Sequence, residues 1–168
     1  MKMISCFLLF FLFLSSVVAA DVETEAEKIL KSSVDKVFTV MLDKEMTLDQ
    51  KKIKVIEITD TVFGYPLMAK LSIGKKHWSE FNTEQRAEFT KLFTDAFRRF
   101  YVDKLDLFSN EEVVFKPATV VKGKKVQIPT MLLSNGKKYS ILYKMSNGKT
   151  GWRIYDITIE GEIGRASC

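Results

Sequence analysis

The only histidine of the chain, His77, stands beside Trp78 in the stretch GKKHW and is the first side chain to consider as a general acid or base. Such a role requires a substrate group, a nucleophile or an orienting carboxylate within hydrogen-bonding reach. His77 follows Lys75 and Lys76 at a position where the sequence predicts a loop between two helices. We therefore interpret it as a surface residue, or as one that packs partly on Trp78, rather than as a catalytic group.

Asp156, in the stretch WRIYD, is the best carboxylate for chemistry in this sequence. Regular strand alternation predicts that it shares a face with Trp152 and Ile154 and is buried there. A buried acid at the mouth of a cone-shaped domain would suit a small hydrolase or isomerase. The alternative, which we favour, is a structural acid bonded to backbone amides or to an arginine. The sequence contains no G-x-S-x-G, Walker or dinucleotide-binding motif.

Residues 1–20 have the three parts of a secretory signal peptide. Lys2 gives the positive start, CFLLFFLFL at 6–14 is the apolar run, and small residues lead to a cleavage site before Asp21. The apolar run is shorter than the ~20 residues that span a bilayer, so a retained membrane anchor is the less favoured reading. We predict that residues 21–168 form a single exported domain. That domain would hold one histidine and one cysteine, Cys168, which predicts no metal site and no cofactor.

The formal net charge of +5 is too small to indicate a nucleic-acid-binding protein, and we expect no nucleic-acid partner. The lysines gather near the predicted turns. If those turns lie together, the lysines would form a basic rim suited to an anionic membrane surface. An equally weighted interpretation is that they keep strand edges soluble. These lysines are Lys122, Lys124, Lys125, Lys137, Lys138 and Lys149.

Hydrophobic periodicity predicts helices in the first part of the chain and strands after about residue 107. The helices are expected at about 22–42, 48–58, 66–73 and 83–101, and the last has a capping-box pattern at Asn82 and Gln85. Turn signals at Lys122-Gly123-Lys124, Asn135-Gly136 and Asn147-Gly148 separate four strands, at about 112–121, 125–133, 138–145 and 150–160. This order predicts an α+β fold, with helices packed on a four-stranded antiparallel sheet.

Large apolar side chains are in surplus on the predicted helices and on one face of the strands. Such a surplus either fills a core or lines an apolar cavity, and the residues alone leave both readings open. The candidate cavity-lining residues are Phe63, Tyr65, Met68, Leu71, Phe89, Phe93, Phe97, Phe100, Ile128, Tyr139, Ile141, Tyr143 and Met145.

Two segments resemble the MlaC-type family of periplasmic phospholipid-binding proteins, the auxiliary components of ABC transporters that are also called toluene-tolerance proteins. The first runs from VFGYPLMAKLSIG at 62–74 through His77-Trp78 to TEQR at 83–86 and on to Phe93. The second is GWRIYDITIEG at 151–161. The ordered pair, placed behind a signal peptide, is the specific part of the resemblance.

The resemblance implies a cone-like fold related to nuclear transport factor 2, with a lipid pocket between helices and sheet. It implies a non-enzymatic carrier that shuttles phospholipid between an outer-membrane lipoprotein complex and an inner-membrane ABC transporter complex, and so maintains outer-membrane lipid asymmetry. The rival ligand is a hopanoid or another lipid. After Glu160-Gly161 the sequence departs from the family pattern, which continues with an apolar segment and a helix. We therefore expect a shortened C-terminus. This leaves a further alternative, namely a non-functional remnant of the family or one that only interacts with other proteins.

Overall fold

The helices come first in the chain, as the sequence predicts. The computed structural model describes residues 17–108, 111–160 and 166–167, so most of the predicted signal peptide lies outside the described residues. The helices are α1 (Val17–Leu42), α2 (Leu48–Asp60), α3 (Tyr65–Ser72), α4 (Gly74–Glu80), α5 (Thr83–Val102) and the short 3-10 helix η1 (Leu105–Leu107). Capping boxes at Thr47–Gln50 and Asn82–Gln85 start α2 and α5, and Pro66 lies in the first turn of α3.

His77 lies in α4, so the prediction of a loop at this position is wrong. Gly74 has a φ of +77°, which ends α3 and lets the chain turn into the next short helix. The His77 side chain is exposed, and its Nδ1 lies 3.4 Å from Oε2 of Glu80 on the same helix. This surface position agrees with a non-catalytic interpretation of the histidine.

The second part of the chain forms an antiparallel sheet in the order β1-β3-β4-β5-β6, with β2 also paired to β3. The strands are β1 (Glu112–Phe115), β2 (Thr119–Lys122), β3 (Lys125–Ser134), β4 (Lys137–Gly148), β5 (Gly151–Glu160) and β6 (Ala166–Ser167). The predicted α+β architecture is confirmed. The strand expected at 112–121 is divided in two around Pro117, which lacks the N–H that a ladder needs.

The turn expected at Asn147-Gly148 lies two residues later. β4 continues through Gly148, and the chain reverses at Lys149-Thr150, where Gly151 takes a φ of +83°. By contrast, Asn135 and Gly136 have the positive φ values that a tight hairpin turn requires.

A bulge in β5 changes the face on which Asp156 lies. Met145 pairs with Ile154, but Lys144 pairs with Asp156, so Tyr155 is the extra residue in β5. Asp156 therefore shares a face with Lys144, whose Nζ lies 2.7 Å from its Oδ2. The expected placement of Asp156 on the Trp152/Ile154 face is wrong.

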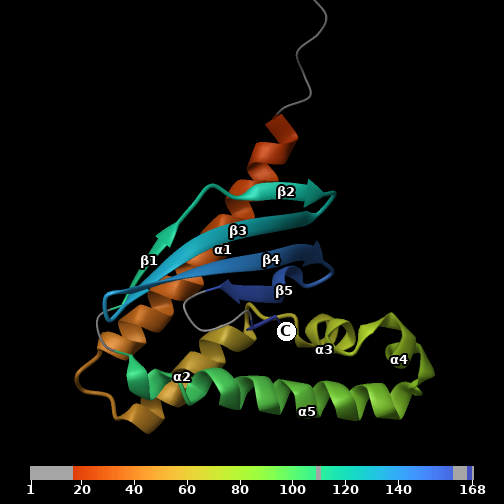
Figure 1. Ribbon diagram of the computed structural model, residues 1–168, viewed down its shortest axis with the longest axis horizontal. Helices are drawn as coiled ribbons and strands as arrows, with labels where there is room; N and C mark the ends of the chain where they lie inside the picture. The colour runs from red at the N-terminus through yellow and green to blue at the C-terminus, as the bar shows by residue number, and fades with distance from the viewer. Residues whose placement is uncertain (1–16, 109–110, 161–165, 168) are drawn as a thin grey trace, which may run out of the picture.

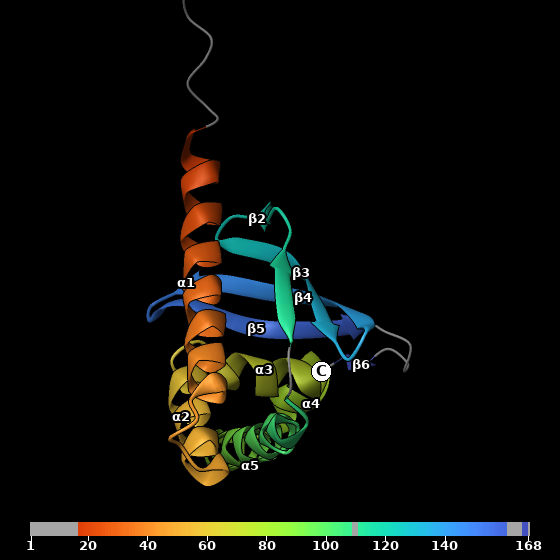
Figure 2. The same ribbon diagram turned by 90° about the vertical axis from the view of Figure 1, so that its left-hand side faces the viewer.

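The packed core lies between α1 and one face of the sheet, here called the inner face (Figure 1). Its members are fully or nearly fully buried. They are Ala26, Leu30, Val62, Ala118, Val126, Ile128, Met145, Trp152 and Ile154. Helices α2, α3 and α5 lie below the sheet, and of these α2 packs against the lower end of α1 (Figure 1); Figure 2 shows the arrangement from the side. Trp152 links the layers, because its Nε1 donates to Oε2 of Glu25 on α1 at 2.9 Å.

The segment Val62–Gly64 joins the helical half to the sheet. The Gly64 amide donates to the Ile154 carbonyl at 2.8 Å, and the Ile154 amide donates to the Val62 carbonyl at 2.8 Å. A Cβ on Gly64 would lie 3.2 Å from both the Arg153 Cβ and the Ile154 carbonyl oxygen. Close packing therefore favours glycine here, because a methyl group would push its neighbours back by a few tenths of an ångström, and this contact fixes where α3 leaves the sheet.

Candidate functional site: an unpacked apolar surface between sheet and helices

Burial on the inner face of the sheet is complete at one end of the strands and partial at the other. Val126, Met145 and Ile154, which are neighbours in register near one end, are at most 1% exposed. Towards the β3–β4 turn, Leu132 and Tyr139 face each other in register and are only partly buried. The core therefore covers one end of the inner face and leaves apolar side chains at the other end incompletely packed.

Helix α5 has an apolar stripe that the protein does not bury. None of its 20 residues is fully buried. Phe93 and Phe97 are half-buried, and the Phe97 ring contacts those of Phe63, Phe93 and Tyr65 of α3. Leu92 is 58% exposed and Phe100 is 55% exposed, and they lie two turns apart on one side of the helix. In a well-packed domain such a stripe faces a core, so its exposure indicates a surface that something else covers.

Phe63 connects the inner face to α5. It forms a bridge with Ile154 of β5, and its ring lies 5.2 Å from that of Phe97 and 6.1 Å from that of Tyr101. Phe97 also stacks on Phe93 at 5.9 Å. These ring contacts join Phe63, Phe93, Phe97 and Tyr101 into one cluster between β5 and α5, here called the aromatic floor.

The structure separates the thirteen predicted lining residues into three groups. Ile128 and Met145 are packed in the α1–sheet core, and Tyr65 and Met68 are buried residues of α3. The half-buried or exposed members lie on several elements: Tyr139, Ile141 and Tyr143 on the inner face, Phe93, Phe97 and Phe100 on α5, Leu71 on α3, and Phe63 between β5 and α5. Phe89 lies apart from the Phe63 cluster, in a second cluster with Trp78 and Phe81. Their role as lining residues stays a prediction.

Three further residues belong to the same surfaces, namely Tyr101 on α5 and Ile157 and Ile159 on β5. Tyr101 continues the four-residue spacing of Phe93 and Phe97, so the helical period already contained this signal. Ile157 and Ile159 pair with Tyr143 and Ile141 across β4 and β5. Their place on the inner face depends on the bulge at Tyr155, which no sequence pattern revealed.

A polar cluster fixes α5 against α2 and α3. Arg98 donates to both carboxylate oxygens of Asp60, at 3.0 and 2.5 Å, and the Tyr65 hydroxyl donates to Asp60 at 2.9 Å. The hydrogen bond to Asp60 raises the pKa of Arg98, and burial raises the pKa of Tyr65 above its usual range. The members of this cluster hydrogen-bond to one another, so its role is to position the three helices rather than to bind a ligand.

Tyr143 is the polar group at the centre of the inner face. It lies on β4 opposite Ile128 and Ile157, and burial raises its pKa to about 12. Its hydroxyl is a protonated hydrogen-bond donor at neutral pH, as in any tyrosine, and lies among the apolar side chains of Ile128 and Ile157.

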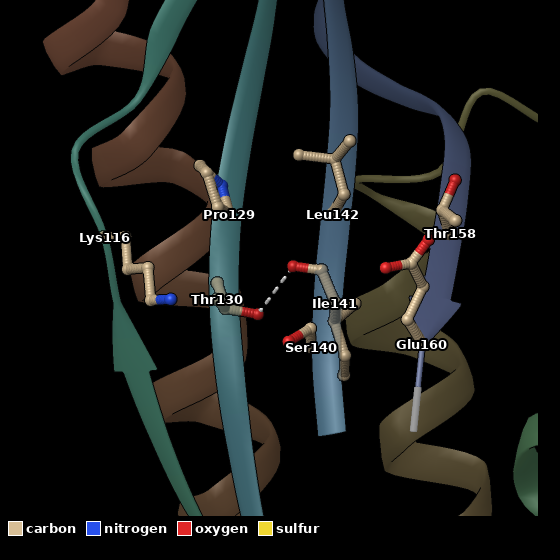
Figure 3. Close-up of a pocket in the computed structure, with 8 residues that line it drawn as sticks. All are labelled: Lys116, Pro129, Thr130, Ser140, Ile141, Leu142, Thr158 and Glu160. Carbon is tan, nitrogen blue, oxygen red and sulfur yellow. Dashed lines mark hydrogen bonds between the residues drawn. The ribbon is translucent and has the colours of Figure 1, made fainter. Parts of the chain in front are cut away.

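Two shallow hollows lie outside this surface. One, of about 250 Å³, is on the opposite, outer face of the sheet, between Pro129, Leu142 and Thr158 (Figure 3). The other, of about 270 Å³, lies where α1 and α2 meet η1, beside Met41 and Phe108. Both are smaller than the roughly 300 to 1,000 Å³ of typical small-molecule pockets.

The outer face also carries the Lys144–Asp156 pair. Asp156 Oδ2 accepts from Lys144, while its Oδ1 is buried without a hydrogen-bond partner among the described atoms. No described cluster of three His, Cys, Asp or Glu side chains has the arrangement of a metal site. In the described part of the chain, no helix combines the length and the hydrophobicity of a membrane span.

Comparison with known proteins decides the family. The model of the MlaC protein family matches residues 31–163, which is most of the chain. The chain belongs to the MlaC family. Among solved structures, it is similar to the phospholipid-binding protein from Ralstonia solanacearum, determined in complex with a phospholipid. That match has a TM-score of 0.69 and 24% identity, and covers 81% of this chain and 78% of the other. None of the curated proteins compared with the chain matches it.

The fold of this MlaC-family chain brings together the two segments in which the sequence resemblance was recognised. The first contains Gly64 and the second contains Ile154, and these two residues are hydrogen-bonded to each other. The same contact places Phe63 beside Ile154 and hence beside α5. The two segments together build the corner at which sheet, α3 and α5 meet, which borders the unpacked apolar surface.

Proposed function

We propose that this MlaC-family chain is a periplasmic carrier that binds the acyl chains of a phospholipid on the apolar surface between the inner face and α5. The single observation that carries the proposal is the unburied apolar stripe of α5, with Leu92 and Phe100 more than half exposed. The family and the phospholipid-bound structural relative support the choice of ligand.

Physical chemistry explains why such a carrier needs no catalytic residue. Burying one methylene is worth about 0.8 kcal/mol, so two long tails of roughly 30 methylenes would cost more than 20 kcal/mol to expose to water. Transfer from bilayer hydrocarbon to an apolar protein surface exchanges similar environments, and its net free energy is small. The protein therefore has to shelter the tails during transit and to dock where they leave the membrane.

The partners in this proposal are an outer-membrane lipoprotein complex and an inner-membrane ABC transporter complex, with lipid moving between them. A hopanoid is the alternative cargo. An enzyme that uses Asp156 is disfavoured, because that carboxylate pairs with Lys144 on the face away from the aromatic floor.

Lipid extraction tests the proposal directly. Protein purified from a Gram-negative periplasm is expected to carry phospholipid at about one molecule per chain, measured by mass spectrometry of the organic extract. A hopanoid in the extract would replace phospholipid as the cargo, and no lipid at stoichiometric level would overturn the carrier function.

A pair of matched variants locates the bound lipid. Phe100→Glu is expected to lower the lipid content at least about fivefold, because a carboxylate is costly against acyl chains. Ile53→Glu on α2 is the control, since Ile53 is similarly exposed, at 58%, but is not among the predicted lining residues. Both variants keep the fold because both side chains are exposed, which circular dichroism checks. Equal lipid content in the two variants would exclude Phe100 from the binding surface.

A further inference from the structure

Two hairpin turns lie side by side at one end of the sheet. Lys125, at the start of β3, pairs with Ser146 near the end of β4, and the Asn147 amide donates to the Lys124 carbonyl at 2.9 Å. The β2–β3 turn and the β4–β5 turn are therefore adjacent, and Figure 1 shows both at the right-hand end of the sheet. Their spacing follows from β3 and β4 being neighbours, about 4.8 Å apart.

These two turns gather four exposed lysines, which we call the basic tip. They are Lys122, Lys124, Lys125 and Lys149. Val121, which is 54% exposed, stands beside them on β2. Gly123 and Gly151 hold the turns with positive φ values, so the lysines extend from short, defined turns rather than from a long loop.

The described acids bonded to these strands do not neutralise the basic tip. Asp156 is paired with Lys144, and Glu25, which accepts a hydrogen bond from the neutral Trp152 indole, keeps one negative charge against the four lysines. The Lys125 ammonium lies 5.2 Å from the centre of the Tyr155 ring, a contact that keeps its charge. The local balance of the described charges is therefore positive.

The opposite end of the sheet has mixed charge. Lys137 and Lys138 lie there, beside the β3–β4 turn, so the six lysines expected to form one rim divide between two ends. Glu111 bonds Ser134 at that end, Glu112 pairs in register with Leu133, and Glu160 pairs with Ser140. The positive charge is thus concentrated at the end that carries the two adjacent turns.

We propose that the basic tip binds the surface of bilayers that contain anionic phospholipid headgroups. Lysine carries a compact point charge that suits a diffuse layer of phosphates, and each lysine near such a surface strengthens binding about fivefold. Val121 adds an apolar group that enters the interface between the headgroups. This surface is separate from the apolar surface of the proposed function, and binding through it does not require a loaded lipid.

An acidic protein is a weaker match for the basic tip. Protein interfaces depend on tryptophan, tyrosine and arginine for most of their energy, and lysine is depleted in them. Apart from the four lysines, the residues of the two turns from 121 to 124 and from 148 to 151 are valine, glycine and threonine. The turns themselves therefore offer no aromatic or arginine anchor. Arg153 and Tyr155 lie beside them, but the Arg153 guanidinium donates to the Trp152 carbonyl and the Tyr155 ring contacts Lys125, so both are engaged within the chain. Binding to headgroups needs no such anchor.

Vesicle flotation tests the proposal. We expect the full chain, purified as secreted, to float with vesicles of phosphatidylglycerol and phosphatidylcholine, and to remain unbound with vesicles of phosphatidylcholine alone. Binding should fall steeply as salt rises, because the interaction is screened. The triple variant Lys122→Glu/Lys124→Glu/Lys149→Glu is expected to lose at least about 100-fold of the apparent affinity.

A matched control separates the basic tip from the net charge. Lys36→Glu/Lys44→Glu/Lys138→Glu makes the same change in charge at exposed lysines on α1, on the α1–α2 connection and at the start of β4. This control is expected to lose less than about fivefold. Equal losses in both variants, equal binding to neutral vesicles, or no vesicle binding at all would overturn the proposal. The last result would leave an acidic protein as the partner. Lipid content measured on the same preparations reports on the carrier function independently.

Discussion

At the scale of single residues, Gly64 shows how one backbone contact determines where a functional surface lies. Its amide is bonded to the Ile154 carbonyl, and a side chain at this position would fit only if its neighbours moved. The neighbouring Phe63 is thereby held at the junction of β5 and α5. A shift of this one contact would move α3 and the aromatic floor together.

Gly64→Ala tests this constraint. The added Cβ would meet the Ile154 carbonyl and the Arg153 Cβ at 3.2 Å, so we expect the free energy of unfolding to fall by about 1 to 2 kcal/mol in urea titrations. Gly148→Ala is the control, because its added methyl group would have no atom within 4 Å beyond its chain neighbours, and its φ is not positive. The control should change stability by less than about 0.5 kcal/mol. A Gly64 variant as stable as the control would contradict the close-packing argument.

Residue patterns predicted one face of the sheet well and one residue badly. Tyr139, Ile141, Tyr143 and Met145 alternate on the inner face as the period of two requires. Asp156 follows the same alternation in sequence, yet the bulge at Tyr155 reverses its direction. A bulge depends on the pairing between two strands, so the sequence of one strand does not reveal it.

At the scale of elements, local signals predicted helix starts and missed a short helix. The capping boxes at Thr47 and Asn82 both form, because their hydrogen bonds involve only neighbouring residues. Helix α4 has seven residues, none of them buried, so it lacks the apolar periodicity by which helices are recognised.

Helix α5 is the long helix whose stability depends most on its own sequence, since α1 and α2 have fully buried residues and α5 has none. Asn82 accepts from the Gln85 amide at 2.9 Å, and Gln85 accepts from the Asn82 amide at 2.9 Å. Asn82→Ala removes one half of this box, so we expect a loss of about 1 kcal/mol, measured as the midpoint of chemical unfolding by circular dichroism. Asn82→Asp keeps an acceptor at the same position and should stay close to the parent. Equal effects of the two substitutions would show that the cap does not limit the stability of α5.

At the scale of the whole molecule, the sequence predicted which residues are apolar but not which of them remain unpacked. Met145 and Tyr139 lie on the same strand and face, yet Met145 is fully buried while Tyr139 is not. The difference arises because α1 covers only one end of the inner face. Such coverage depends on the placement of whole helices, which a linear pattern does not contain.

This unequal packing gives the molecule two regions of different local stability, which hydrogen exchange distinguishes. In lipid-free protein, we expect amides of β3 and of the α1 segment around Leu30 to exchange slowly, because a packed core protects them. Amides of α5 should exchange faster, since its apolar stripe is exposed. A bound phospholipid would bury that stripe and so stabilise the folded form of α5 relative to its locally unfolded form. Loading should therefore slow exchange in α5 by at least about tenfold. Exchange in β3 should change much less, and mass spectrometry of peptic fragments measures both segments in one experiment. Equal slowing of α5 and β3 would mean that lipid stabilises the fold as a whole, and no change in α5 would mean that the acyl chains bind elsewhere.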